Sequence, residues 1–371
     1  MAKTINDVYL QLFHRLRDGG DPQPSMTARE LTAVACHADR AHTAAWAHSY
    51  LDNATVDYAN ILCDRVLGGE PLAYILGEWD FYGLTFRVDK SVLIPRADTE
   101  KLCELTIEQA KPRISPRILD LCCGSGCIGI AAAHEVEDAR VLAVDLSDGA
   151  LRLTRENAHR LGVSGRLLAM KADATMPPPG GVGPFDIIVS NPPYITRSEM
   201  AQLDHSVADF EPHEALYGGV DGLDFYRAIC ENWGDTLAHG GILLFECGWK
   251  QADAVAEILQ KYGFSGHRHG NFARGRRIVD RRAHRLKNLA NRHKRAVVED
   301  NRRKRRRHRL AVHVQLVHRA GVAVLLPVIF QKHCRLRVCR EQHKREQQGK
   351  NPLQCNHSLP PAHPRRVNFI P

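Results

Sequence analysis

Residues 118–131 carry the sequence ILDLCCGSGCIGIA, and this stretch decides the fold. Its first four residues predict the end of a buried strand, the small residues after them predict a tight loop, and a helix is expected to begin near Gly126. Glycines let a backbone approach a ligand closely, and the N-terminus of a helix favours electron-rich groups. We interpret the loop as a ligand-binding loop; a βα turn without a ligand is the alternative.

The spacing of small residues in this loop narrows the ligand class. The loop lacks the GxGxxG pattern of dinucleotide-binding loops and the GK[ST] ending of a phosphate-binding P-loop. The form DLxxGSG is instead typical of class I methyltransferases that use S-adenosylmethionine (SAM). The loop therefore predicts a SAM-dependent enzyme.

Strand-like and helix-like stretches alternate from residue 116 onward. Alternating units of this kind predict an α/β fold with a parallel, doubly wound, Rossmann-like sheet. The predicted strands cover 117–121, 141–145, 167–171, 186–190 and 242–247. The predicted helices lie around 126–136, 148–162, 225–237 and 252–262.

A small helical domain is predicted over residues 1–77. The first helix is expected over 5–17, where four apolar residues recur at helical spacing: Ile5, Val8, Leu12 and Leu16. Thr27 and Glu30 have the spacing of a capping box, so we expect a second helix to open there. The domain is either a structural cap or a module that recognises a partner. Further helices are expected over 41–51, 58–67 and 71–77.

A β-hairpin is expected to link the two domains. Residues 78–96 (EWDFYGLTFRVDKSVLIPR) are rich in aromatic and β-branched residues and are interrupted by Gly83. The methyltransferase domain is then expected to span 97–280.

The end of the chain differs in charge from the rest. Residues 281–371 hold 24 of the 51 Lys and Arg residues but 4 of the 42 Asp and Glu residues, which leaves an excess of 11 acidic residues in 1–280. The acidic body argues against a duplex-DNA surface there, because DNA affinity depends on neutralising phosphates. The basic stretch predicts a disordered tail. Either the tail contacts RNA nonspecifically, or a shift of reading frame near 265–280 replaced the native end.

Asp145 is a candidate ribose ligand. It ends the second predicted strand, 25 residues after Asp120, and a carboxylate at that place can accept hydrogen bonds from both ribose hydroxyls of a nucleoside. Asp173 ends the third strand and is expected near the adenine, although a cap or turn role is an alternative for it.

Residues Asn191 to Tyr194 form the motif NPPY directly after a predicted strand. Two prolines fix the backbone and remove two N–H donors, so the carbonyls there can face a ligand. The Asn191 side-chain oxygen and the Pro192 carbonyl are placed to accept both hydrogens of a planar –NH2 group, and Tyr194 can stack on that group. The motif predicts methylation of an amide or exocyclic amine nitrogen; a purely structural turn is the alternative.

These motifs together resemble the HemK/PrmC-type peptide chain release factor N5-glutamine methyltransferases over about residues 5–265. The segments that carry the resemblance are GEWDFYGLTF, VLIPRADTE, DLCCGSGCIGIA, VSNPPYI and FEPHEALYGGVDGL. The resemblance implies a class I SAM-dependent methyltransferase domain, SAM as cofactor, and an N-terminal domain that helps to dock the release factor. The implied substrate is the glutamine in the GGQ motif of class 1 release factors.

The same resemblance assigns the site residues. It places catalysis on Asn191, Pro192 and Tyr194, and substrate binding on these three residues and Pro193. It places cofactor binding on Cys122, Cys123, Gly124, Ser125, Gly126, Asp145, Ala174 and Asn191. This chain departs from the family pattern at Cys122, where glycine is usual, and at Ala174, where an aromatic residue is frequent. The family's closing strand pair is matched only loosely, by residues 271–286 (NFARGRRIVDRRAHRL).

The sequence leaves alternative activities open and gives expectations for the location of the protein. A glutamine methyltransferase for ribosomal protein uL3, an adenine-N6 nucleic-acid methyltransferase and an RNA-binding protein acting through its tail are the alternatives. No signal peptide is expected at the N-terminus, and the longest apolar run, 321–330, is too short to span a membrane. The eleven cysteines suggest free thiols in a reducing cytoplasm, and no metal-binding spacing is seen.

Overall fold

The computed structural model describes residues 2–265, 268–270 and 277–283 of the 371-residue chain. These residues belong to one compact unit, Met1–Arg303. The expectations for the tail, namely disorder, RNA contact and a shift of reading frame, concern residues that lie almost wholly outside the described part. None of the described helices combines the length and the apolar character that a membrane crossing needs.

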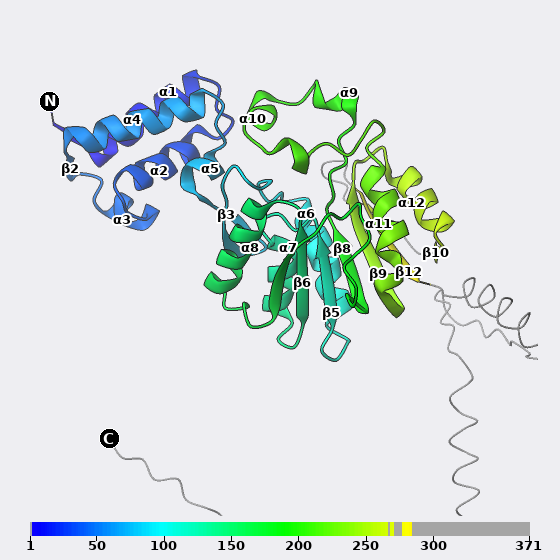
Figure 1. The fold of residues 1–371 in the computed structure, drawn as a ribbon. Helices are drawn as coiled ribbons and strands as arrows, with labels where there is room; N and C mark the ends of the chain where they lie inside the picture. Colours follow the sequence, from blue (N-terminus) through cyan, green and yellow to red (C-terminus); the bar gives the residue numbers. More distant parts are fainter. Residues whose placement is uncertain (1, 266–267, 271–276, 284–371) are drawn as a thin grey trace, which may run out of the picture. The chain divides into compact units, whose positions relative to one another are not determined.

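A mixed β-sheet forms the centre of the larger domain (Figure 1). Its strand order is β10-β12-β9-β8-β5-β6-β7, and β11 pairs with β12 beside this path. Strands β5 to β9 are parallel to their neighbours among themselves, which confirms the predicted parallel, doubly wound sheet. The strands are β5 (Arg117–Leu121), β6 (Arg140–Asp145), β7 (Leu167–Lys171), β8 (Phe185–Ser190), β9 (Leu237–Cys247), β10 (Phe264–Ser265), β11 (Arg268–Gly270) and β12 (Arg277–Ala283).

The register of the central strands places three loops at one edge of the sheet. Leu121 at the end of β5 pairs with Val144 of β6 and with Ser190 of β8. The chain segments that begin at Cys122 and Asn191 therefore leave the sheet side by side, next to the end of β6. In parallel sheets the carboxyl edge is where ligands bind.

Helices cover both faces of this sheet. Alternate residues of a strand point to opposite faces, so Ile187 and Val189 pack in one apolar core while Ile188 packs in the other. The first core includes residues of α6 (Thr99–Ala110), α7 (Cys127–Glu135) and α8 (Asp148–Arg160). The second includes residues of α11 (Asp224–Asn232) and α12 (Ala252–Lys261). Short helices complete the domain: α9 (Arg197–Met200), α10 (His205–Ala208), η1 (His213–Ala215) and η2 (Gly234–Thr236).

Two differences from the sequence predictions concern this domain. Helix α6 was not predicted. The helix expected over 225–237 is wrong at its end, because α11 stops at Asn232 and Leu237 already begins β9. Trp233, fully buried, follows α11 and directs the chain through η2 back into the sheet.

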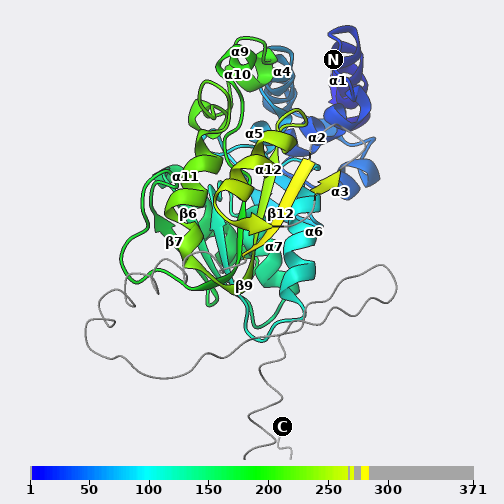
Figure 2. The ribbon, with the colours of Figure 1, turned by 90° about the vertical axis from the view of Figure 1, so that its right-hand side faces the viewer.

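The loosely matching stretch after residue 270 supplies a strand of the sheet. Strand β12 runs antiparallel to β9, with Arg277 opposite Cys247 and Arg282 opposite Ile242, and also pairs with β10 (Figure 2). The expected domain boundary at residue 280 falls inside this strand.

The N-terminal domain has five helices, which are α1 (Ile5–Asp18), α2 (Pro24–Ala35), α3 (Arg40–Ala45), α4 (Asn53–Leu67) and α5 (Leu72–Leu76). Of these, α1, α2 and α4 supply buried residues to the domain's own apolar core, and α5 packs against that core. The first helix is confirmed, and its four predicted apolar residues are all buried. Thr4 and Asp7 form the capping box that opens it, a pattern that satisfies two free backbone donors.

Three predictions for the N-terminal domain differ from the structure. Thr27 does not cap α2: the helix begins at Pro24, a residue suited to the first turn, and the Thr27 hydroxyl donates to Asp21. The helix expected over 41–51 ends at Ala45, and β2 (Tyr50–Leu51) instead pairs with β1 (Lys3–Thr4). The helix expected over 58–67 begins earlier, because the Asp52 carboxylate accepts from the Thr55 N–H and caps α4.

The predicted hairpin is confirmed as β3 (Glu78–Phe81) and β4 (Leu84–Arg87). Tyr82 and Gly83 turn the chain with φ of 51° and 73°, as two-residue hairpin loops require. The segment after β4 carries no further strand. It is anchored to α5, where the Tyr74 hydroxyl donates to the Val92 carbonyl at 2.6 Å.

Candidate functional site

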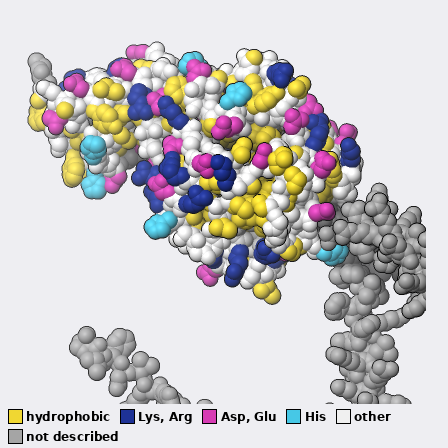
Figure 3. Space-filling model, in the orientation of Figure 1, with side chains coloured by type: hydrophobic (Ala, Val, Ile, Leu, Met, Phe, Trp, Pro, Cys, Tyr) yellow, Lys and Arg dark blue, Asp and Glu magenta, His cyan; other side chains and the backbone are white. Residues whose placement is uncertain are grey.

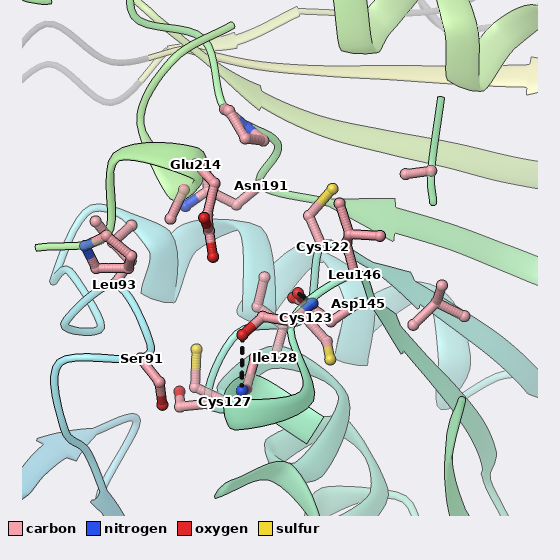
Figure 4. Close-up of a pocket in the computed structure, with 18 of the residues that line it drawn as sticks. Ser91, Leu93, Cys122, Cys123, Cys127, Ile128, Asp145, Leu146, Asn191 and Glu214 are labelled. Atoms are coloured by element: carbon pink, nitrogen blue, oxygen red, sulfur yellow. Dashed lines mark hydrogen bonds between the residues drawn. The ribbon is translucent and has the colours of Figure 1, made fainter. Parts of the chain in front are cut away.

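A cavity of about 300 Å³ opens at the carboxyl ends of β5, β6 and β8 (Figure 4). Seven of the predicted site residues lie on its wall: Cys122, Cys123, Ser125, Asp145, Ala174, Asn191 and Pro193. Asp173 lies there too. Gly124, Gly126, Pro192 and Tyr194 are not on the wall, but each is next in sequence to a residue that is. The structure thus gathers most of the predicted residues around one cavity.

The loop after β5 owes its shape to three left-handed residues. Cys122, Gly124 and Gly126 have φ of 59°, 55° and 80°. A β-carbon at Gly126 would come within 2.8 Å of Ile130 Cδ1 and 2.9 Å of Thr154 Cγ2, so only glycine fits there. Cys122 occupies a conformation that L-residues adopt at a cost of about 1 kcal/mol. Glycine, which the family usually has at this position, would adopt this conformation without strain. The departure at Cys122 therefore adds strain to the loop.

Asp145 faces the cavity with both carboxylate oxygens anchored by backbone. Gly124 N donates to Oδ2 at 2.9 Å, and Ser147 N donates to Oδ1 at 3.0 Å. Burial raises the pKa of Asp145, and these backbone hydrogen bonds oppose the rise. Each oxygen keeps acceptor capacity for a ligand, because a carboxylate oxygen accepts two hydrogen bonds. A half-buried carboxylate of this kind, facing a cavity, fits a ligand that brings hydroxyl donors.

Asp120 lies beneath the loop and anchors helix α7. It is 1% exposed, and its Oδ2 accepts from Gly129 N at 2.9 Å. Burial raises the pKa of Asp120 to about 7, with a smaller contribution in the same direction from Asp145. The loop therefore rests on a buried carboxyl group whose pKa is raised into the neutral range.

The NPPY segment begins where β8 ends. Ser190 Oγ donates to the Leu121 carbonyl at 2.7 Å and ties the end of β8 to the end of β5. Asn191 Nδ2 donates to Thr99 Oγ1 at 3.2 Å. Asn191 and Pro193 face the cavity, whereas Pro192 is buried behind it. Asn191 therefore stands at the boundary between the cavity and the segment that follows.

A glycine-containing segment supports the NPPY backbone. Ile195 N donates to the Leu216 carbonyl and Gly218 N donates to the Ile195 carbonyl, at 2.9 and 3.0 Å. A β-carbon at Gly218 would lie 2.5 Å from the Pro193 carbonyl oxygen. Another at Gly222 would lie 2.2 Å from the Tyr194 carbonyl oxygen. Segment 216–222 can pack this closely only because it has glycine at both contacts.

Gln251 joins these two segments to the end of β9. Its Nε2 donates to the carbonyls of Tyr194, Gly222 and Asp221 at 2.9, 3.3 and 3.4 Å. Its Oε1 accepts from Gly248 N at 3.0 Å. The side-chain amide thus satisfies groups from three loops at once.

A buried ion pair links two further segments that border the cavity. Arg96, just before α6, pairs with Glu211, whose side chain is 1% exposed. Arg96 itself lies on the wall, and so do Pro212 and Glu214 next to Glu211. Figure 4 shows the Glu214 carboxylate pointing into the cavity, and its charge contributes to the raised pKa of Asp145.

The sequence analysis missed Thr99, Gln251 and the Arg96–Glu211 pair as parts of the site. Arg96, Thr99 and Glu211 lie in the segments VLIPRADTE and FEPHEALYGGVDGL, which carried the resemblance without an assigned role. Nothing in the local pattern of QADAVAEIL marks Gln251. Within the described residues, no three His, Cys, Asp or Glu side chains are grouped to hold a metal ion.

Comparison with known proteins places the chain among methyltransferases. A family model described as the methyltransferase small domain matches residues 97–208, and the PrmC N-terminal domain matches residues 7–77. A curated release factor glutamine methyltransferase from Clostridium botulinum is 41% identical over 194 residues, which are 52% of this chain and 69% of the relative. Another, from Bradyrhizobium diazoefficiens, is 37% identical over 263 residues, 70% of this chain and 87% of the relative. A solved ribosomal protein L11 methylase from Lactobacillus delbrueckii subsp. bulgaricus matches with a TM-score of 0.39 and 20% identity, over 54% of this chain and 86% of that chain.

Proposed function

This chain belongs to the release factor glutamine methyltransferase family, and from that premise we propose its reaction in detail. It transfers a methyl group from SAM to the side-chain amide nitrogen (N5) of the glutamine in the GGQ motif of class 1 peptide chain release factors. The observation that carries the proposal is the position of Asn191. It shares one cavity wall with Asp145, with residues of the glycine loop and with Pro193 of the same NPPY segment.

SAM is the cofactor that the cavity residues fit. Asp145 offers a half-buried carboxylate to the ribose hydroxyls, the loop 122–126 offers backbone close to the ligand, and Ala174 offers an apolar contact for the adenine. SAM, when bound, supplies a methyl group activated by a positively charged sulfur.

The protein's own contribution is to position the target nitrogen. An amide nitrogen is a poor nucleophile, because its lone pair is delocalised into the carbonyl. In our proposal Asn191 Oδ1 and the Pro192 carbonyl accept the two amide hydrogens, and this turns the nitrogen lone pair toward the cavity. Both hydrogen bonds strengthen as the nitrogen becomes positive, so they stabilise the transition state. The proton leaves to water after transfer, and Tyr194 stacks on the amide plane from outside the cavity.

The partner in this proposal is a protein loop. Residues 1–280 carry an excess of 11 acidic over basic residues, which disfavours a phosphate backbone as substrate. On the face drawn in Figure 3, basic and acidic side chains are interspersed over the described residues. The helical domain of residues 1–77 docks the release factor, and the reaction takes place in the cytoplasm.

Incubation with labelled SAM and a purified, unmethylated release factor tests the proposal. We expect one added methyl group on the GGQ peptide by mass spectrometry, and none on a release factor whose GGQ glutamine is replaced by alanine. Ribosomal protein uL3 and duplex DNA serve as competing substrates. Methylation of either one, with none on the release factor, would contradict the proposal.

A further inference from the structure

Thr99 is a buried polar residue on the wall of the cavity. It is the first residue of α6 and is 3% exposed. Its side chain is β-branched, which restricts rotation about χ1. Its backbone N–H donates to the Arg96 carbonyl at 3.0 Å, and the Arg96 side chain is in turn paired with Glu211. Thr99 is therefore held in a fixed place relative to the cavity.

The hydroxyl of Thr99 meets the amide of Asn191. Asn191 Nδ2 donates to Thr99 Oγ1 at 3.2 Å, across 92 positions of sequence. Within the part of the chain that the structure describes, this is the hydrogen bond recorded for the Asn191 side chain. Because the amide nitrogen is turned toward Thr99, Oδ1 is the atom left to accept from a ligand.

We propose that Thr99 is a positioning residue that holds the Asn191 side chain with Oδ1 available to the substrate amide. This inference rests on the proposed function and extends it to a residue without contact to the reacting atoms. Without the Thr99 hydroxyl, the Asn191 amide can rotate about its last torsion and present Nδ2 to the substrate. An –NH2 group facing another –NH2 group offers no acceptor, so the target nitrogen loses its alignment.

The chain offers a matched control on the same helix. Thr106 is also in α6 and 0% exposed, and its hydroxyl donates to the Leu102 carbonyl. Thr99→Val and Thr106→Val therefore each remove one buried threonine hydroxyl from this helix. Only the first removes a partner of Asn191. Thr99→Ser restores the hydroxyl at position 99.

Kinetics on the full chain give the first readout. We expect Thr99→Val to lower kcat on the release factor about 10- to 100-fold, the effect of losing one aligned hydrogen bond. The dissociation constant of SAM, measured by calorimetry, should stay within about twofold, and Thr99→Ser and Thr106→Val should keep kcat within about threefold. Equal losses in Thr99→Val and Thr106→Val, or a normal kcat in Thr99→Val, would overturn the inference.

A spectroscopic readout is independent of turnover. The side-chain amide resonances of Asn191, assigned by their loss in Asn191→Ala, should shift and exchange faster with water in Thr99→Val and not in Thr106→Val. If the wild-type chain fails to methylate the release factor while these resonances respond as expected, the proposed function fails and the positioning by Thr99 stands. Unchanged resonances in Thr99→Val would overturn the positioning.

Discussion

The glycine loop after β5 and the NPPY segment after β8 border the same cavity, but different kinds of contact hold them. The glycine loop is held by partners close in sequence: Gly124 N bonds to Asp145, 21 positions away, and Thr154 Oγ1 bonds to the Gly124 carbonyl, 30 positions away. The NPPY segment is supported by the nearby segment 216–222, and it is also held by Thr99, 92 positions away, and by Gln251, 57 positions away. The proposed cofactor side of the cavity is thus a product of neighbouring βα units. The proposed substrate side also draws on distant segments.

This difference has a consequence for how each side responds to mutation. Changes near the glycine loop should alter cofactor binding and the stability of the domain. Changes around NPPY should alter turnover while cofactor binding persists. The following substitutions test that separation.

Asn191→Ala should have the largest effect. Losing the acceptor that aligns the target nitrogen should lower kcat roughly 10²- to 10³-fold, the range found when a transition-state hydrogen bond is removed. Labelled-methyl transfer to the release factor measures it, and thermal unfolding checks that the fold is kept. A variant with near-normal turnover would remove Asn191 from the mechanism.

Asp120→Asn should change the pH dependence of stability. The folded pKa of Asp120 is raised to about 7, above the value of about 3.9 expected for the unfolded chain. Below about pH 4, Asp120 is protonated in both the folded and the unfolded state, and its contribution to the free energy of unfolding is fully present. Between about pH 4 and pH 7 the unfolded chain loses this proton and the folded chain keeps it, so the free energy of unfolding falls.

The asparagine variant does not ionise at position 120, so its advantage over the wild type should grow by roughly 2–4 kcal/mol between pH 4 and pH 7 and then stay constant. Urea unfolding at pH 4.5, 6 and 8 measures this. Asp148→Asn serves as the control, because the Asp148 side chain is exposed. A constant difference between wild type and Asp120→Asn at all three values would show that Asp120 is ionised in the folded protein.

Asp145→Ala should weaken SAM binding without a comparable loss of kcat when SAM is saturating. The ribose hydroxyls lose a charged acceptor, a contribution of about 1.5–3 kcal/mol or about 10- to 100-fold in affinity. Calorimetry with SAM is the measurement. Asp148→Ala, at an exposed position three residues further along the chain, is the control. An unchanged affinity would mean that another residue holds the ribose.

Gln251→Ala should have the smallest effect of the four substitutions. Unlike Asp145→Ala, it should affect turnover rather than SAM binding. Three carbonyls lose their common donor, so the NPPY backbone is less well fixed and kcat should fall about 10-fold with SAM affinity nearly unchanged. Gln260→Ala is the matched control, because Gln260 is exposed on α12, the helix that Gln251 immediately precedes. If Gln251→Ala weakened SAM binding as much as it lowered kcat, the two sides of the cavity would not be separable.

The glycine loop, Asp145 and NPPY could be predicted from the sequence because each follows a strand with a clear apolar pattern. The loop shape depends on residues that are adjacent in the chain, and their left-handed conformations are typical of glycine. The same local reasoning predicted the sheet, whose strands alternate with helices at regular spacing.

Thr99 and Gln251 could not be predicted in the same way. Their roles depend on contacts across 92 and 57 positions, and no local pattern distinguishes them from ordinary helix-start residues. The helix expected over 41–51 was wrong for a related reason: Tyr50 and Leu51 pair with Lys3 and Thr4, a contact that overrides local helix propensity.

Strand β12 has a consequence for the order in which the domain is completed during synthesis. Strand β9 pairs with β8 on one side and with β12 on the other, and β12 is made only after α12. Until Ala283 has left the ribosome, β9 has an unpaired edge. Several of its residues are apolar and fully buried in the complete domain, among them Leu243, Leu244 and Phe245. Open apolar edges pair with other chains and lead to aggregation. Chains that stop short of residue 277 should therefore accumulate as insoluble species even though the whole cavity has already been synthesised.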